Sequence, residues 1–268
     1  MKIRAFALLI LSAILFGTSE RVLAQVPSQP LTRPPDPGAD KTKTLPNLSD
    51  RSGWPRPVAD NEKYSYLLLD QLEYRNPKTV GWDILGWYGG DYKRYWFKSE
   101  GSQTISTRRA GGIEAQALYG KSISPFFDLQ YGLRLDTRPS GERVFGVLAL
   151  QGLAPYRFDI EPALFVDQRG NVSARFTATY ETFLTQRLVL QPRFETNLAL
   201  QEVRRFGVGS GLNDTELGLR LRYEVRREFA PYIGVSFGQS FGGTASIARS
   251  RGEPVRETRF VTGIRLWY

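Results

Sequence analysis

Apolar and polar residues alternate with a period of two in successive segments from Tyr64 to the last residue, Tyr268. Because successive side chains of a β-strand point to opposite faces, each segment predicts a strand with one apolar and one polar face. The clearest segments are 127–136, 156–165, 172–181, 187–198, 216–224 and 258–268. Their lengths are near the ~9–11 residues that a tilted membrane-spanning strand requires. Almost no helical stripe of comparable length is present.

The connections between these segments alternate between short turns and longer loops. Short turns are expected at 89–91, 122–125, 152–155, 184–186 and 226–229, and longer loops at 101–111, 201–213 and 240–257. This alternation is typical of an all-β, transmembrane, up-and-down antiparallel β-barrel. Counting from Tyr64 predicts about 12 strands, with both ends of the barrel sequence on the short-turn side. Segment 258–268 is then expected to close the barrel against the first strand.

A secreted β-sandwich is the competing fold, because its strands also alternate. Sandwich strands are usually shorter, near five or six residues. A soluble core would also give no reason to place charges at successive inward positions, so the pattern favours the barrel. Pro162 and Pro192 fall inside predicted strands and cannot donate to a ladder. Each is therefore expected to mark a bulge or a position near the rim.

The first 60 residues predict two segments that precede the barrel. Residues 1–24 have a basic start, a short apolar run and Val22–Ala24 at a suitable cleavage position, so they predict a signal peptide. Residues 25–60 are rich in proline and polar residues and predict a disordered periplasmic segment, or alternatively a partner-binding proline-rich segment. Residues 61–268 are the predicted barrel, integral to the outer membrane of a Gram-negative cell.

Three absences from the composition limit the chemistry of this chain. It contains no Cys and no His, and its only Met is Met1. Catalytic arrangements of the Ser-His and Cys-His types and His- or Cys-based zinc sites are therefore excluded. No enzymatic activity is expected, although an Asp- or Lys-based hydrolase is not excluded by these absences. The net charge of +9 favours anionic neighbours, and the signal peptide favours a membrane surface with lipopolysaccharide over nucleic acid.

The polar faces of the predicted strands indicate a lumen lined with charge. Two interpretations of the lumen are open: interlocked salt bridges that fill a narrow barrel, or a polar permeation path with a carboxylate cation site. The expected inward residues are Glu73, Asp83, Arg94, Glu100, Glu114, Asp128, Arg134, Asp136, Arg157, Asp159, Glu161, Arg175, Glu181, Arg187, Arg193, Glu195, Glu216, Arg220, Arg222, Glu224, Arg259 and Arg265.

Two further groups of residues suggest contacts outside the lumen. The apolar face of the last segment, formed by Phe260, Ile264, Leu266 and Tyr268, resembles the signal by which the barrel assembly machinery recognises its clients. The expected outer loops carry guanidinium groups that could bind lipopolysaccharide phosphates, and ordinary solvated charge is the alternative. These loop residues are Arg108, Arg109, Arg204, Arg205, Arg249, Arg251 and Arg256.

Several motifs resemble the copper resistance protein B family of outer-membrane proteins. They are Gly53–Pro55 with Pro57–Asn61, Asp70–Arg75, Gly86–Asp91, Trp96–Gly101, Ser124–Gln130, Gln151–Tyr156, Leu184–Leu188 and Leu217–Tyr232. The resemblance implies an outer-membrane barrel that contributes to copper tolerance, alongside a periplasmic copper-binding or copper-oxidising partner. Members of that family typically carry a Met- and His-rich N-terminal segment, whereas this one is proline-rich and has neither residue after Met1.

The resemblance also implies copper as the bound ion, and this chain offers it only oxygen ligands. Thioethers select Cu(I) and imidazole suits Cu(II), and both are missing after Met1. The candidate metal ligands, which lie in or beside the family motifs, are Glu73, Asp83, Asp91, Glu100 and Asp128. The expected function is copper homeostasis through binding or passage in a charged lumen. The alternative is a general small-solute channel or structural protein that has lost its copper ligands.

Overall fold

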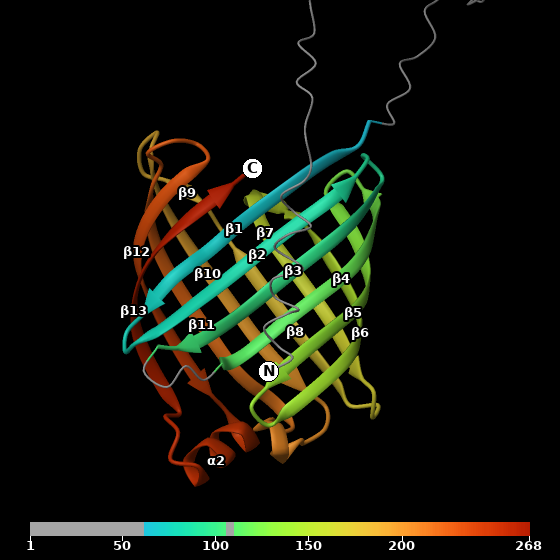
Figure 1. Cartoon of the computed structure of the whole chain (residues 1–268), viewed down its shortest axis with the longest axis vertical. Coiled ribbons are helices and arrows are strands. Elements are labelled where there is room, and N and C mark those ends of the chain that lie inside the picture. Colours follow the sequence, from blue (N-terminus) through green and yellow to red (C-terminus); the bar gives the residue numbers. More distant parts are fainter. Residues whose placement is uncertain (1–61, 106–109) are drawn as a thin grey trace, which may run out of the picture. The chain divides into compact units, whose positions relative to one another are not determined.

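A computed structural model of the chain describes residues 62–105 and 110–268, and they form a closed antiparallel β-barrel (Figure 1). Each strand pairs with the next along the sequence, except that β8 and β9 both pair with β10, and the last strand pairs with the first. The strands are β1 (Tyr64–Arg75), β2 (Thr79–Gly89), β3 (Lys93–Thr104), β4 (Ala110–Ser124), β5 (Phe127–Arg138), β6 (Gly141–Ala154), β7 (Phe158–Asp167), β8 (Val172–Thr179), β9 (Thr182–Phe183), β10 (Leu188–Ala199), β11 (Gly211–Tyr223), β12 (Phe229–Ser240) and β13 (Arg256–Trp267). Short helices are η1 (Pro155–Arg157), η2 (Arg204–Phe206) and α2 (Gly242–Ser250).

The barrel wall has twelve strand positions, because β8 and β9 share one of them, and this confirms the predicted fold class and number of strands. β8 and β9 pair with successive parts of β10, so together they occupy one strand position in the barrel wall. The closure of the barrel is also as predicted, because β13 pairs with β1 along most of its length. A sandwich is excluded by this closed ladder.

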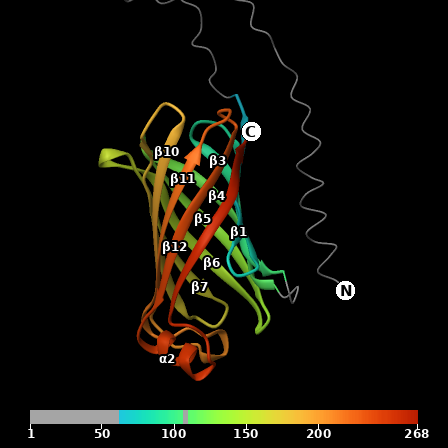
Figure 2. The ribbon, with the colours of Figure 1, turned by 90° about the vertical axis from the view of Figure 1, so that its left-hand side faces the viewer.

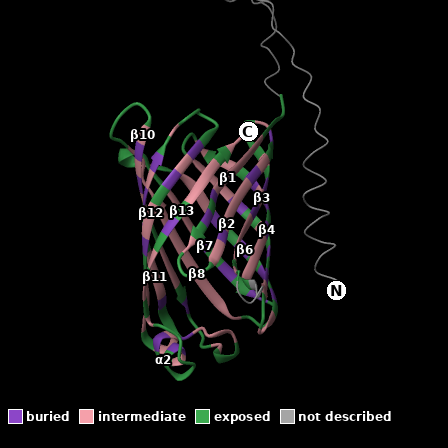
Figure 3. Ribbon diagram, turned by 60° about the vertical axis from the view of Figure 1, so that its left-hand side comes forward, coloured by how far each residue is buried: buried purple, intermediate pink, exposed green. Residues whose placement is uncertain are grey.

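Buried and exposed residues alternate along the strands (Figure 3), and many of the exposed ones are large apolar residues, unlike those of a soluble protein. On the outer face, Leu133, Ile233 and Phe260 are 61%, 64% and 70% exposed. On the inner face of the same strands, Arg134, Tyr232 and Val261 are buried. An apolar outer face and a polar inner face are the arrangement expected of a barrel surrounded by lipid. None of the helices in the described part of the chain has the length and apolar composition that a membrane crossing requires.

The two ends of the barrel differ in their connections (Figure 2). β1 begins and β13 ends at one end, which also carries the short turns that follow β2, β4, β6, β9 and β11. The opposite end carries α2 in the 241–255 loop and η2 in the 200–210 loop. The expected long loop at 101–111 is shorter than predicted, because β3 extends to Thr104 and β4 begins at Ala110.

The two internal prolines interrupt the ladder without shifting its register. The β6–β7 pairs pass from Ala149↔Ala163 to Gly152↔Ile160, so Pro162 has no assigned partner on β6. Pro192 lies opposite the break between β8 and β9, where its carbonyl accepts a hydrogen bond from the Tyr180 N–H at 3.1 Å. A missing N–H donor accounts for both gaps. Neither proline forms the bulge that was expected for it. The register shifts at other positions, one of them in β1 between Leu69 and Gln71.

The predicted signal peptide (1–24) and proline-rich segment (25–60) lie outside the described residues, as do Arg108 and Arg109. Those predictions are not addressed by the structure.

Removing the last two residues is expected to prevent assembly of the barrel. The Tyr268 and Leu67 backbones exchange two hydrogen bonds of 2.9 Å, and Trp267 Nε1 donates to the Arg227 carbonyl at 2.6 Å. Their loss would open the seam between the first and last strands. Gel migration with and without heating measures closure, and Tyr156→Ala, at an exposed turn residue, is the control. A normal heat shift in the truncated chain would contradict the prediction.

Candidate functional site

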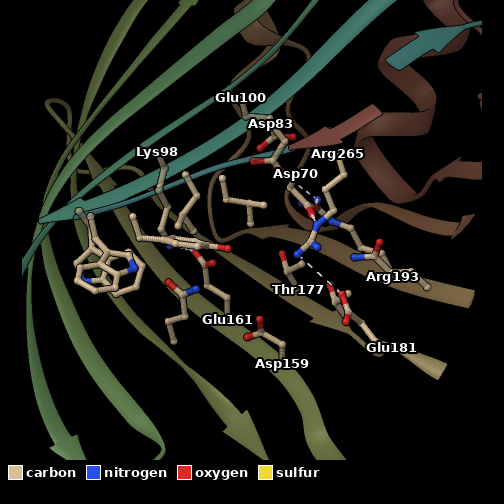
Figure 4. A pocket seen from close by; sticks show the side chains of 18 of the residues that line it. Asp70, Asp83, Lys98, Glu100, Asp159, Glu161, Thr177, Glu181, Arg193 and Arg265 are labelled. Atoms are coloured by element: carbon tan, nitrogen blue, oxygen red, sulfur yellow. Dashed lines mark hydrogen bonds and ion pairs between the residues drawn. The ribbon is translucent and has the colours of Figure 1, made fainter. Parts of the chain in front are cut away.

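The candidate site is a cavity of about 530 Å³ inside the barrel, in the half nearer the end where β13 stops. Side chains from ten of the strands reach it, and Figure 4 shows many of them converging. Its wall includes seven carboxylates and five cationic side chains, an excess of two negative charges. The carboxylates are Asp70, Asp83, Glu100, Glu114, Asp159, Glu161 and Glu181, and the cations are Lys98, Arg157, Arg175, Arg193 and Arg265.

A bulge in β1 places Asp70 in this cavity. Before the bulge, Tyr66, Leu68 and Asp70 line the cavity. After it, Gln71 and Glu73 are the buried residues, so the inward-facing parity changes from even to odd. Strict alternation predicts only one of the two neighbours Asp70 and Gln71 to face inward, and the sequence analysis accordingly missed Asp70. Its only sequence signal is its place in the Asp70–Arg75 motif.

Arginine side chains hold several of the cavity carboxylates in place. Arg193 Nη1 lies 2.8 Å from Asp83 Oδ2 and 4.0 Å from Asp70 Oδ2, and its Nη2 lies 3.3 Å from Glu195 Oε2. Arg265 Nε donates to Asp70 Oδ1 at 2.9 Å (Figure 4). These bonds connect β10, β1, β2 and β13 across the interior. They compensate charge in a place where an unpaired charge would be costly.

The opposite wall of the cavity is less completely paired. Lys98 Nζ donates to Glu161 Oε1 at 2.6 Å. Asp159, two residues away on β7, is exposed to the cavity and forms no hydrogen bond or ion pair with any residue in the described ranges. Asp159 is therefore a carboxylate that a cation could reach without displacing a protein partner.

Glu73 lies outside this cavity in a fully buried cluster. Its carboxylate accepts hydrogen bonds from Arg75 Nε at 2.6 Å, Arg220 Nε at 3.0 Å and the Tyr232 hydroxyl at 3.0 Å. Arg220 also donates to Gln71 Oε1 at 3.0 Å. With 1% of its surface exposed and three donors bound, Glu73 is a structural anion rather than an accessible ligand.

The five predicted metal ligands are not brought together. Asp83 and Glu100 line the cavity, Glu73 does not, and Asp128 pairs with Arg94 at 3.1 Å nearer the rim. Asp91 is exposed in the turn between β2 and β3. Within residues 62–105 and 110–268, no group of three or more acidic residues is arranged to hold a metal ion. The structure therefore offers dispersed carboxylates in a shared cavity instead of one preformed site.

The remaining expected lumen residues lie in several places. Arg222 is buried and donates to Gln191, Glu181 and Glu224, and Glu216 accepts from Ser236 at 2.8 Å. Arg259 pairs with Glu257 on the inner face of β13. Arg187 was expected to point into the lumen but is exposed in the turn before β10, because that strand begins one residue later than predicted.

One side of the interior is apolar, which the sequence analysis did not predict. A buried cluster of seven residues packs inside β3–β7, with Leu85 and Trp87 against it. Its members are Trp96, Leu118, Phe145, Val147, Ala149, Ala163 and Phe165. Arg134 stacks at 4.5 Å on Phe165 and pairs with Glu114 at 2.7 Å and Asp136 at 2.6 Å. Inner and outer faces of 144–150 are both apolar, so alternation of polarity cannot reveal which residues point inward.

The loop arginines differ in their pairing. Arg204 pairs with Glu202, and Arg251 Nη2 donates to the Arg204 carbonyl at 2.5 Å. Arg249 and Arg256 are exposed at a groove between α2 and β13 and form no ion pair with another described residue. These two guanidinium groups are therefore available to an external anion.

Comparison with known proteins identifies relatives over most of the chain. The model of a family described as copper resistance protein B precursor matches residues 63–268. A copper resistance protein B of Escherichia coli is 41% identical over 238 residues, covering 88% of this chain and 78% of that protein. A copper resistance protein B homolog of Pseudomonas syringae pv. tomato is 37% identical over 238 residues, covering 88% and 79%. Neither name describes an enzymatic activity.

Solved porin structures are similar to this chain at low sequence identity. The NanC porin is 12% identical with a TM-score of 0.49, and the alignment covers 76% of this chain and 99% of that one. The KdgM porin is 16% identical with a TM-score of 0.43, covering 76% and 98%. These similarities carry no information about the solute that this barrel handles.

Neutralising Glu73 is expected to destabilise the barrel strongly. Glu73→Gln would leave the buried Arg220 without its carboxylate, and breaking a buried pair in this way costs about 3–5 kcal/mol of unfolding free energy. Asp159→Asn, which removes an unpaired carboxylate, should change that free energy by less than about 0.5 kcal/mol. Urea unfolding of the barrel folded into lipid vesicles measures both. Equal stability of the two variants would contradict the assigned role of Glu73.

Proposed function

This chain belongs to the copper resistance protein B family and is an outer-membrane β-barrel, and from this premise we propose that it contributes to copper tolerance by taking copper ions into its lumen. The observation that carries the proposal is the excess of carboxylates over cationic groups around the 530 Å³ cavity. Carboxylate-lined passages favour cations over anions. A divalent ion would be attracted more strongly than a monovalent one, because the Coulomb energy scales with charge.

The chemistry of the donor set supports Cu(II) as the ion. The sequence contains no Cys, no His and no Met after Met1, so no thiolate, imidazole or thioether is available for tight copper binding. Among first-row divalent ions Cu(II) nevertheless binds a given oxygen or nitrogen donor set most strongly. Weak binding to dispersed carboxylates suits an ion that must be released again. The primary contact in this proposal is Asp159, and the other carboxylates of the cavity contribute negative charge rather than a shared ligand set.

The runner-up function is a general small-solute channel or a structural outer-membrane protein. It is supported by the number of lumen carboxylates that already hold arginines, among them Asp70 with Arg265 and Asp83 with Arg193. In this alternative the ion pairs only fill the barrel. Copper would then show no preference over other cations.

We also propose which partners meet each end of the barrel. The end where β13 stops would face the periplasm, as a chain with a signal peptide and a periplasmic tail requires, and a periplasmic copper protein would deliver or receive the ion there. The α2 end would face the exterior, where the unpaired Arg249 and Arg256 could bind lipopolysaccharide phosphates. The outward residues Phe260, Ile264, Leu266 and Tyr268 would engage the barrel assembly machinery.

Removing the unpaired cavity carboxylate is expected to weaken Cu(II) binding severalfold. Asp159→Asn deletes one negative charge and one oxygen ligand without breaking a protein contact. Asp91→Asn, at an exposed turn outside the cavity, should bind copper like the wild type. Isothermal titration of the purified barrel with Cu(II), and with Cu(I) as a comparison, measures the effect. Identical Cu(II) titrations of the two variants would argue against the cavity as the binding place.

Growth of a deletion strain across a copper series is expected to fall, and to be restored by the wild type more fully than by Asp159→Asn. Equal amounts of folded barrel, checked by the heat shift on gels, are the control. Unchanged growth of the deletion strain would remove copper tolerance as the function. Swelling of vesicles with neutral solutes of graded size would then test the channel alternative.

A further inference from the structure

We propose that Arg175 is the residue that closes the lumen and so determines whether an ion can cross the barrel. This inference deepens the proposed function, since it concerns the route beyond the cavity floor. It rests on two cavities in the lumen, one on each side of a single guanidinium group.

The two spaces follow one another along the lumen. The first is the 530 Å³ cavity, which extends from Arg157 and Phe183 near the short turns to Glu100 and Glu114 at its floor. The second, of about 150 Å³, begins at Arg134 and Asp136 and reaches Thr244 of α2 at the other end. Among the residues that the structure describes, Arg175 alone lines both spaces. The partition between the spaces therefore includes this side chain.

Carboxylates from three other strands hold the Arg175 guanidinium across the interior. Its Nη2 lies 3.0 Å from Glu114 Oε2 on β4, and its Nη1 lies 3.2 Å from Glu100 Oε2 on β3. Its Nε lies 3.5 Å from Glu195 Oε1 and donates to Asn197 Oδ1 at 3.1 Å, both on β10. Strands β3 and β4 are not neighbours of β8 in the barrel, so these bonds span the lumen.

Arg134, which lines the second space beside Arg175, is packed too firmly to serve as the moving part. Arg134 is buried, pairs with Glu114 and Asp136, and stacks on Phe165. Phe165 belongs to the buried apolar cluster. Arg175, by contrast, keeps 17% of its side chain exposed to the two spaces. Withdrawing this one side chain would connect the spaces while the surrounding wall stays in place.

The charges left behind would set the selectivity of the opened lumen. Without the guanidinium, Glu100, Glu114 and Glu195 would face the joined space with one compensating cation fewer. A ring of carboxylates at the narrowest point favours cations. The same three glutamates would attract a divalent ion that arrives from the cavity, and such an ion would compete with Arg175 for them.

Conductance across a planar lipid bilayer in potassium chloride tests the proposal. The wild-type barrel should be closed for most of the recording, and Arg175→Ala should raise the mean conductance severalfold and favour K⁺ over Cl⁻. Arg157→Ala is the matched control, because it removes an arginine from the mouth of the same cavity. That control should conduct like the wild type. Equal conductance of the wild type and Arg175→Ala, or a wild type that is continuously open, would overturn the proposal.

A second variant tests whether the higher conductance of Arg175→Ala comes from the missing guanidinium or from misfolding. Arg175→Ala combined with Glu114→Gln removes the guanidinium and one carboxylate together, so the interior keeps its net charge. It should also conduct more than the wild type, with weaker cation selectivity than the single variant. The heat shift on gels confirms closure of each barrel before recording. Because the salt is potassium chloride, the outcome does not depend on copper binding, and calorimetry with Cu(II) can fail or succeed independently.

Discussion

The ladder between β13 and β1 is the constraint on which the rest of this structure depends. A sheet in a lipid environment cannot leave an open edge, because no water is available to hydrogen-bond the exposed N–H and C=O groups. Tyr268 and Leu67 close that edge at the extreme C-terminus. Closure then separates every strand into an outer face that must be apolar and an inner face that lipid does not reach. The charged residues of the membrane-spanning strands can be accommodated only on that inner face.

Placing charges inside a narrow barrel requires that nearly all of them be paired. Inside this barrel, single arginines pair with more than one carboxylate, as Arg193 does with Asp83 and Glu195. These pairs are weak evidence for stability in themselves, since desolvation offsets much of the Coulomb attraction. Their arrangement nevertheless divides the carboxylates into two kinds. Glu73 is saturated with donors, whereas Asp159 has none among the described residues.

That division bears on how a barrel without sulfur or imidazole ligands could serve copper tolerance. A tight site would need sulfur or imidazole donors, which the sequence after Met1 lacks. In the proposed function, a shared cavity with a modest excess of carboxylates would instead concentrate cations without retaining them. In the proposed route, the guanidinium of Arg175 at the floor of that cavity would link binding to passage, since Glu100 and Glu114 line the cavity and also hold this guanidinium.

The sequence by itself determined the barrel, the number of its strands and the inward direction of residues such as Arg259 and Arg265, because alternation of polarity is a local property. The place of Asp70 was decided by a bulge, which has no marker in the pattern. The inner apolar cluster lay hidden where both faces of β6 are apolar. Partners were decided by tertiary structure alone: Arg220 and Glu73 are 147 residues apart. Strand tilt and register bring such residues to the same height in the lumen, and neither quantity is encoded in the period of a single strand.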